Sequence, residues 1–333
     1  MKTHADSSPD KPCPGELAAR PAVQRLALDS FRPQTLDDAV SGGAVDHIQL
    51  ARGRFVGELL HAKLGSRGVD YGAYNLPLLA HGEMPRDRIV LGFVASDCDD
   101  GNLNGDVVRD AAVVVLVEGS ELHYRLAPRT RWLGFRVTRG TLEQTGVRLG
   151  TQSFTLSRLA AGRQQQMASV VGDAAETLRA IERGDPDILD ATAAGAIVAE
   201  KLTAVFSATL ATEDRSPPSQ SMAPSRRLRI VKRTRDYFDA HLAHPIEVTR
   251  VCAHAGASVR TIERAFVETC GANPKQMLTL MRMTRARRAL QAAGPGEITV
   301  ARVAVDCGFF HLGRFSTNYT ALYGESPSAT LQA

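Results

Sequence analysis

The stretch Glu247-Val-Thr-Arg-Val-Cys-Ala-His-Ala-Gly256-Ala-Ser-Val-Arg-Thr-Ile-Glu-Arg-Ala-Phe266 decides the fold of the last third of this chain. The pattern recurs 52 to 53 residues later, where Gly308 aligns with Gly256 and Tyr319 with Phe266. Each copy predicts a short helix, a tight turn with a glycine and a second helix, followed by Gly-x-x-Pro. This is the helix-turn-helix plan, and two copies allow one subunit to reach two successive major grooves of DNA.

Charge is distributed unevenly along the 333 residues, whose overall net charge is +4. Residues 226–333 hold 16 Lys and Arg against 8 Asp and Glu, a net of +8, so the rest of the chain carries −4. A basic third beside an acidic remainder indicates that one module meets a polyanion and the other does not.

Cysteine usage and hydropathy favour a cytoplasmic protein. No two cysteines form a Cys-x-x-Cys pair, which argues against a disulfide framework or a zinc site. We expect no metal and no cofactor. No apolar run approaches the length of a membrane span, so we expect no membrane partner. Residues 1–20 lack the apolar core of a signal peptide and predict a disordered tail.

Residues 21–150 predict a β-rich domain. Short apolar segments separated by Gly, Asp, Asn and Pro favour a compact β-sandwich or barrel. The candidate strands are Phe55–Leu60, Ile89–Val94, Val113–Val117, Leu122–Leu126 and Leu133–Val137.

Residues 151–212 predict a helical segment, because the apolar spacing changes from that of strands to that of helices. Gly184-Asp185-Pro186 divides it into an antiparallel pair. The apolar stripe of this pair, which includes Leu178 and Leu202, must pack on the sandwich, on a second subunit, or on both. Residues 213–225, rich in Pro and Ser, predict a linker to the domain of residues 226–333.

In the first copy, Gly256 makes the turn and Ser258 is the predicted N-cap of the second helix. Ile262 and Phe266 share the inward face. Arg260, Glu263 and Arg264 then point outward, where Arg can pair with guanine and Glu can accept from cytosine.

The second copy is poorer in side chains that discriminate bases. His311 is its predicted N-cap, Phe315 and Tyr319 face inward, and Gly313 and Thr317 are among the outward residues. We therefore expect backbone contacts and shape readout there. A long helix, Lys275–Gln291, joins the copies and carries the basic cluster Arg285, Arg287 and Arg288.

Gly308-Phe309, Phe315, Tyr319 and Gly324-x-x-Pro327, with the first copy upstream, resemble the AraC/XylS family of transcription regulators. The stretch Gly308-Phe-Phe-His-Leu-Gly-Arg-Phe315, continued by Gly324-Glu-Ser-Pro-Ser328, is similar to the subgroup of ethanolamine-utilisation regulators.

The resemblance implies two helix-turn-helix subdomains bridged by a helix, regulation of transcription, usually activation, and a cupin-like sensor and dimerisation module in the N-terminal half. Some family members place Gln and Arg on the second recognition helix, and this chain does not. The residues predicted to contact DNA are Ser258, Arg260, Thr261, Glu263, Arg264, His311, Leu312, Gly313, Arg314, Ser316, Thr317 and Arg288.

Tyr71, Tyr74 and Trp132 are the candidates for an effector pocket in the β-rich domain, although residues of these types also serve as sandwich core. No phosphate-binding loop or nucleophile motif is present, so no catalytic residue is expected.

The fold class predicted is α+β with two domains: a cupin-like β-sandwich or barrel with a helix pair, then an all-α bipartite helix-turn-helix domain. The predicted function is a ligand-responsive, sequence-specific regulator of transcription, with promoter DNA, a small-molecule effector, a second copy of the chain and RNA polymerase as partners. Two alternatives stay open: an enzyme with a sandwich active site and an accessory helical domain, and an architectural DNA-binding protein without an effector.

Overall fold

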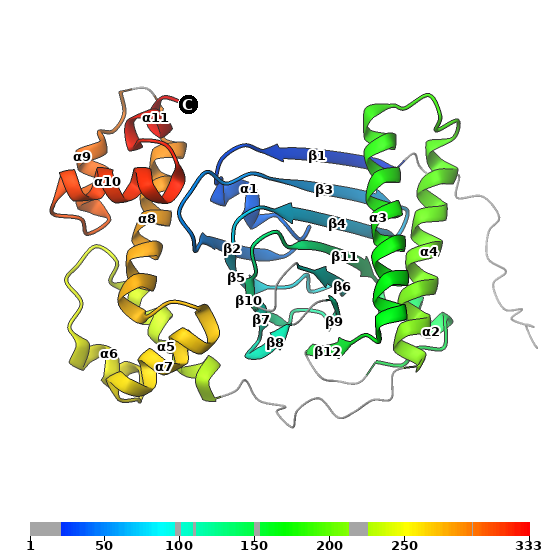
Figure 1. The fold of residues 1–333 in the computed structure, drawn as a ribbon, viewed down its shortest axis with the longest axis horizontal. Helices are drawn as coiled ribbons and strands as arrows, with labels where there is room; N and C mark the ends of the chain where they lie inside the picture. Colours follow the sequence, from blue (N-terminus) through cyan, green and yellow to red (C-terminus); the bar gives the residue numbers. More distant parts are fainter. Residues whose placement is uncertain (1–20, 97–100, 109–110, 150–153, 213–225, 295) are drawn as a thin grey trace, which may run out of the picture.

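The computed structural model describes residues 21–333 except 97–100, 109–110, 150–153, 213–225 and 295. The predicted tail of residues 1–20 and the predicted linker of residues 213–225 lie outside the described residues. Strands and two long helices make up the N-terminal half, and short helices around one long helix make up the C-terminal half (Figure 1).

The N-terminal half contains two antiparallel sheets, as the strand spacing predicted. The first sheet has the order β1 (Ala22–Leu28), β3 (Gly57–Leu64), β4 (Arg67–Tyr74), β11 (Arg131–Val137), β6 (Ile89–Ala95), β9 (Ala111–Leu116) and β12 (Phe154–Arg158). The second has the order β2 (Ala44–Gln49), β5 (Leu78–Glu83), β10 (Glu121–Leu126), β7 (Gly101–Leu103) and β8 (Asp106–Val108). All five predicted strands are present; the cupin-like form stays a prediction.

Strand β4 shows why several strands escaped the sequence pattern. Its glycines oppose large side chains of β11, Gly68 opposite Arg136 and Gly72 opposite Trp132. A Cβ at either glycine would collide with the guanidinium or the indole, so the neighbouring strand requires glycine at these two positions. Because glycine has low β-propensity, the sequence pattern does not mark this segment as a strand. Its interior also holds Asp70, which is fully buried.

The helix pair α3 (Ala161–Arg183) and α4 (Ala191–Thr212) covers the outer face of the first sheet (Figure 1). Gly184 ends α3 in the left-handed conformation, at φ 66°, as a C-cap glycine does. Leu178 and Leu202 are completely buried in one cluster with the sheet, and the ring of Phe206 stacks on Phe135. The stripe therefore packs on the sandwich of its own chain.

Two expectations about residues 151–212 need correction. The segment is not wholly helical, because β12 pairs with β9 along the edge of the first sheet. In addition, Ala191–Ala211 is long and apolar enough, by length and composition, to cross a membrane, contrary to the expectation that nothing approaches that length. Glu200 and Lys201 lie exposed at mid-helix, and a core helix of a sheet-packed protein passes the same test.

Two short helices complete the N-terminal half, α1 (Pro33–Asp37) before β2 and α2 (Arg139–Gln144) after β11. The C-terminal half contains α5 (Arg226–Ala240), α6 (Val248–Ala255), α7 (Val259–Cys270), α8 (Pro274–Ala292), α9 (Val300–Asp306), α10 (Leu312–Tyr323) and α11 (Pro327–Gln332). The predicted helices of both copies and the long joining helix are present within a residue or two of their expected bounds. Asn273 and Gln276 start α8 with a reciprocal capping box.

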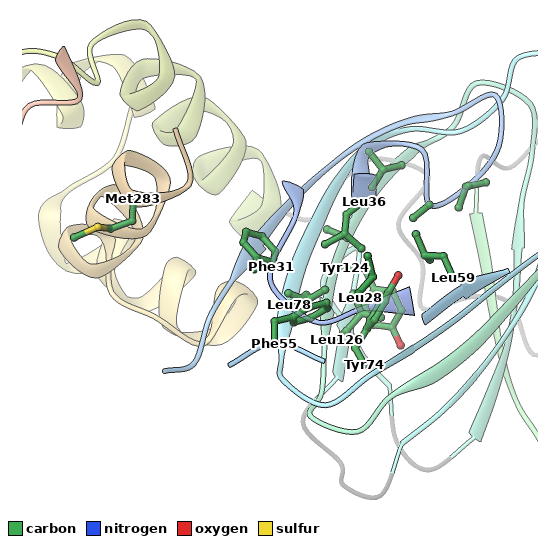
Figure 2. Close-up of a cluster of buried hydrophobic side chains, with 14 of the residues drawn as sticks. Leu28, Phe31, Leu36, Phe55, Leu59, Tyr74, Leu78, Tyr124, Leu126 and Met283 are labelled. Carbon is green, nitrogen blue, oxygen red and sulfur yellow. The ribbon is translucent and has the colours of Figure 1, made fainter. Parts of the chain in front are cut away.

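The two halves share one apolar cluster at their junction. The ring of Phe31, which precedes α1, stacks on Tyr323 at the end of α10, with centroids 5.8 Å apart. Figure 2 shows Phe31 on the side of the sandwich core that faces Met283 of α8. The helical half is thus docked on the sandwich through buried contacts as well as connected to it in sequence.

Candidate nucleic-acid interface

The first copy is built from α6, a turn at Gly256 and α7. Gly256 adopts φ 64°, and the hydroxyl of Ser258 accepts from the backbone N–H of Thr261 at 3.3 Å, as the sequence predicted. Ile262 and Phe266 are buried, which turns the opposite face of α7 to solvent.

The three predicted base-reading side chains of α7, Arg260, Glu263 and Arg264, are all exposed on that face. Arg264 donates through Nε to Glu268 at 2.8 Å, and this hydrogen bond lowers the pKa of Glu268. Arg227 of α5 pairs with the same carboxylate at 2.8 Å. To contact a base, Arg264 must break this solvent-exposed ion pair. The free-energy cost is small, because exposed ion pairs contribute little to stability.

The second copy keeps the same framework with different outward residues. His311 is the N-cap of α10 by position, although its side chain makes no capping bond. Phe315 is buried, Gly313 and Thr317 are exposed, and the hydroxyl of Thr317 donates back to the carbonyl of Gly313 at 3.0 Å. Of the other predicted contacts, Leu312 and Arg314 are exposed and Ser316 is half-buried. Sequence reasoning missed Phe310, which is 63% exposed just before the helix.

The structure places Arg288 away from the outward faces. Its guanidinium forms two hydrogen bonds with Asp37 of α1, and Nη2 also lies 3.0 Å from Asp46 of β2. These carboxylates raise its pKa further, so the charge is permanent but already compensated. The predicted DNA contact of Arg288 would require the two halves to separate.

Arg287 is the largest fully buried side chain of the described residues, so the predicted basic cluster of α8 is not a surface cluster. It bonds with Glu325 through Nη2 at 2.6 Å and donates to the hydroxyl of Tyr319 at 3.1 Å. Its Nε donates to the backbone carbonyl of Phe31 in the N-terminal half. Arg287 of the helical half therefore holds the second helix-turn-helix copy in place and also links the helical half to the N-terminal half.

The first copy, together with α5, docks on the second sheet through buried polar groups: Arg235 of α5 and Cys270 of α7. Nη2 of Arg235 donates to Nε2 of His81 at 2.7 Å, which requires a neutral His81, and Sγ of Cys270 lies 3.9 Å from Nε2 of His123. Burial, with Arg235 nearby, lowers the pKa of His81 to about 2 and that of His123 to about 3. This docking surface therefore depends on two uncharged histidines.

An apolar cavity of about 70 Å³ lies between the sheets. Trp132 lines it, Tyr74 packs against Trp132 at 6.4 Å between ring centroids, and Tyr71 lies in a separate cluster under Arg179 of α3. The structure therefore does not bring the three predicted pocket residues together. His47 also lines the cavity, and burial lowers its pKa to about 4.

Ser41, His61 and Asp70 form a cluster that the sequence did not reveal. The Ser41 hydroxyl donates to Oδ1 of Asp70 at 2.6 Å, and Nδ1 of His61 lies 2.9 Å from the same oxygen. A catalytic triad needs the two different nitrogens of the imidazole, one for each partner. Here Ser41 and Asp70 both contact Nδ1, so the arrangement is not that of a hydrolase.

Comparison with known proteins places the similarity in the C-terminal half. Residues 251–333 match a family model described as a helix-turn-helix domain. Over 103 residues the chain is 37% identical to the probable thc operon regulatory protein of Rhodococcus erythropolis, with 31% of each chain covered. Over 101 residues it is 30% identical to the XylDLEGF operon transcriptional activator of Pseudomonas putida, which covers 30% of this chain and 32% of that protein.

A solved structure, that of a probable AraC family transcriptional regulator from Rhodopseudomonas palustris, is 34% identical over 31% of this chain and 94% of that chain, with a TM-score of 0.29. The chain matches about a third of the length of the two curated relatives. These proteins are named as regulators of transcription, not as enzymes. Residues 251–333 are therefore a helix-turn-helix domain, as the sequence pattern predicted, and the relatives that share it are regulators of transcription.

Proposed function

We propose that the protein is a cytoplasmic, small-molecule-responsive regulator of transcription, acting as an activator at promoter DNA. The observation that carries the proposal is the pair of helix-turn-helix copies in one chain, each with its recognition face open to solvent while the rest of the half is docked. Arg260, Glu263 and Arg264 supply hydrogen-bonding readers on the first copy, as direct recognition in the major groove requires.

A coupling route to the N-terminal half supports responsiveness to an effector. The segment from Phe31 to Gln49 contacts the helical half, through Asp37 and Asp46 on Arg288. The same segment lines the internal cavity with Val45 and His47. A molecule bound beside this segment changes the stability of the docked arrangement only if it binds the docked and released forms with different affinity.

Dimerisation, the cupin-like form of the sensor and contact with RNA polymerase belong to the same proposal. The apolar stripe of α3 and α4 is satisfied within the chain, so it no longer requires a second copy. Exposed residues of α4, including Ile197 at 55% exposure, leave a helix face available for one.

The test is binding of the full chain to fragments selected from the source genome. We expect a small set of enriched fragments, and log affinity should fall linearly with log salt with a slope of about −0.9 per phosphate neutralised. A footprint on one enriched fragment should show two protected major grooves roughly 10–10.5 base pairs apart.

Failure has a clear form. If no fragment is enriched over random DNA, or if affinity does not change with salt, the protein is not a sequence-specific DNA-binding regulator. Enrichment with a single protected groove would restrict DNA reading to one copy.

A further inference from the structure

A basic groove of about 370 Å³ opens at the edge of the sandwich, where β1 and β3 meet the loop between α1 and β2. This volume is within the range of sites that hold metabolite-sized ligands, whereas the apolar cavity of about 70 Å³ is far below it. The residues that line the groove are Ala22, Val23, Gln24, Ser41, His61, Ala62, Lys63, Gly65, Ser66, Arg67, Arg88 and Arg136.

The lining combines four permanent positive charges, on Lys63, Arg67, Arg88 and Arg136, with the imidazole of His61. No Asp or Glu is among the lining residues. Protein surfaces ordinarily mix charges of both signs, and a concave site lined by one sign concentrates ions of the other.

The acidic groups close to the groove compensate only part of its charge. Asp70 is fully buried behind it, with Oδ2 accepting from Nε of Arg136 at 2.6 Å and Oδ1 accepting from Ser41. Asp70 therefore orients Arg136, whose side chain remains partly accessible, instead of facing the groove itself.

The other charges have weak or exposed partners. Arg67 pairs with Glu200 of α4, a carboxylate that is 69% exposed, and Arg88 lies 3.5 Å from its exposed neighbour Asp87. Lys63 has no ion pair among the described residues. Such exposed pairs are worth little and yield readily to a ligand that offers several oxygens at once.

We propose that this groove binds a small anion through its carboxylate or phosphate oxygens. Lys63 and Arg88 supply charge-assisted hydrogen bonds, and Arg136 presents a guanidinium held by Asp70. Nδ1 of His61 is engaged by Asp70 and Ser41, which leaves Nε2 for the ligand.

The groove is connected through the chain to the elements that contact the helical half. Ser41 follows Ala39 and Val40, which line the internal cavity, and lies in the segment that contacts α8 through Asp37 and Asp46. The proposal that the groove binds an anion does not depend on any role in transcription. Only the further step, that this anion is the effector, rests on the proposed function.

The test uses the purified full chain without DNA, at constant ionic strength set by chloride. Inorganic phosphate and succinate are the anionic probes, and succinamide is the uncharged match of succinate. Calorimetric titration and thermal unfolding should show saturable binding and a raised unfolding temperature with at least one anion, and neither with succinamide. Binding of phosphate alone would show that the groove takes phosphate groups, and binding of succinate alone would show that it takes carboxylates.

Two variants locate the site. Lys63→Gln and Arg88→Gln should each weaken anion binding about tenfold, since each removes one charge-assisted hydrogen bond. Arg52→Gln, at an exposed position outside the groove, is the matched control and should bind as the unmodified chain does. Neither groove residue supports a buried group, so circular dichroism should report native folds for both.

The proposal is overturned if neither anion binds saturably, if succinamide binds equally well, or if the groove variants retain full affinity. A final measurement separates it from the proposed function. DNA affinity with and without the bound anion tests the effector role alone, and an unchanged DNA affinity leaves an anion site that is not the effector site.

Discussion

The two helix-turn-helix copies share the same arrangement of helices but differ in the side chains that they expose and in how they are held. The first exposes Arg260, Glu263 and Arg264, and its neighbour α5 rests on the sandwich through Arg235 against His81. The second exposes Leu312, Gly313 and Thr317 beside one arginine, Arg314, and is held by the fully buried Arg287. We therefore expect the first copy to read bases and the second to anchor the domain, although both show the same helix spacing.

The difference also teaches where regulation can act. The first copy is docked through uncharged histidines, a contact that changes with protonation. The second is docked through guanidinium groups that remain charged at any physiological pH, together with the Phe31–Tyr323 stack. Release of the helical half should therefore begin at the first copy and end at the second.

The largest expected effect concerns the anchoring copy. Arg287→Ala should lower the free energy of unfolding of this half by about 3–5 kcal/mol, because it leaves Glu325 and the Tyr319 hydroxyl without their buried partner. Urea unfolding followed by circular dichroism measures this. The exposed neighbour changed in Arg285→Ala should lose no more than about 0.5 kcal/mol. Equal stabilities for the two variants would show that Arg287 is not an anchor.

Acidification should loosen the docking of the first copy. His81 and His123 have pKa values of about 2 and 3 in the folded chain and about 6.5 when unfolded, so the unfolded state binds more protons once the pH falls below about 6.5. Stability is present above that pH and is lost as the pH falls from about 6.5 toward the folded pKa, by roughly 2 kcal/mol per histidine at pH 5.

Hydrogen exchange of α5 and α7 between pH 7 and pH 5 measures the loosening. In His123→Gln the loss of protection at pH 5 should shrink, because one of the two titrating groups is absent. Equal pH sensitivity in that variant and in the unmodified chain would show that His123 does not control docking.

The reading copy is tested by the loss of base preference. Arg264→Ala should weaken binding to the cognate site by about 1–3 kcal/mol and relax the preference at one base pair, because a bidentate contact is removed. Binding to a set of single-base variants of the site measures both changes. Retention of the full preference would mean that Arg264 does not contact a base.

The smallest effect is expected on the second recognition helix. Thr317→Ala should cost less than about 1 kcal/mol on the same sites, and about equally on all of them, because its hydroxyl already bonds the carbonyl of Gly313. Competition binding with the same single-base variants measures it. A loss as large and as base-specific as that of Arg264→Ala would erase the distinction between the copies.

Local pattern predicted the elements whose own sequence sets their structure. The helices of both copies, the N-cap at Ser258 and the break at Gly184 follow from spacing and capping chemistry, which act within a few residues. Strands such as β4 were missed because they are stabilised by their neighbours: Gly72 belongs in a strand only because Trp132 lies opposite. The apolar stripe of α3 and α4 was predicted, and only its partner, the sheet of the same chain, was left open.

The candidate sites divide in the same way. The outward face of α7 follows from the helix period once Ile262 and Phe266 are assigned to the core. The sequence could not show that Arg288 meets Asp37, since 251 residues separate them and no local signal marks a long-range ion pair. Nor could it show that Lys63, Arg88 and Arg136 converge on one groove, because Lys63 and Arg136 lie on different strands and Arg88 lies in the connection before a third.

The sequence by itself determined that the chain ends in a duplicated helix-turn-helix domain, because periodicity, turn glycines and net charge are properties of contiguous residues. The tertiary structure alone decided which charges stay exposed on the helical half and which hold the two halves together. Arg264 and Arg287 are both arginines on regular helices, but Arg264 is exposed and available to a partner, whereas Arg287 is fully buried and holds the halves together. A charge acquires its role from the dielectric and the partners around it, and these are set by segments far away in the chain.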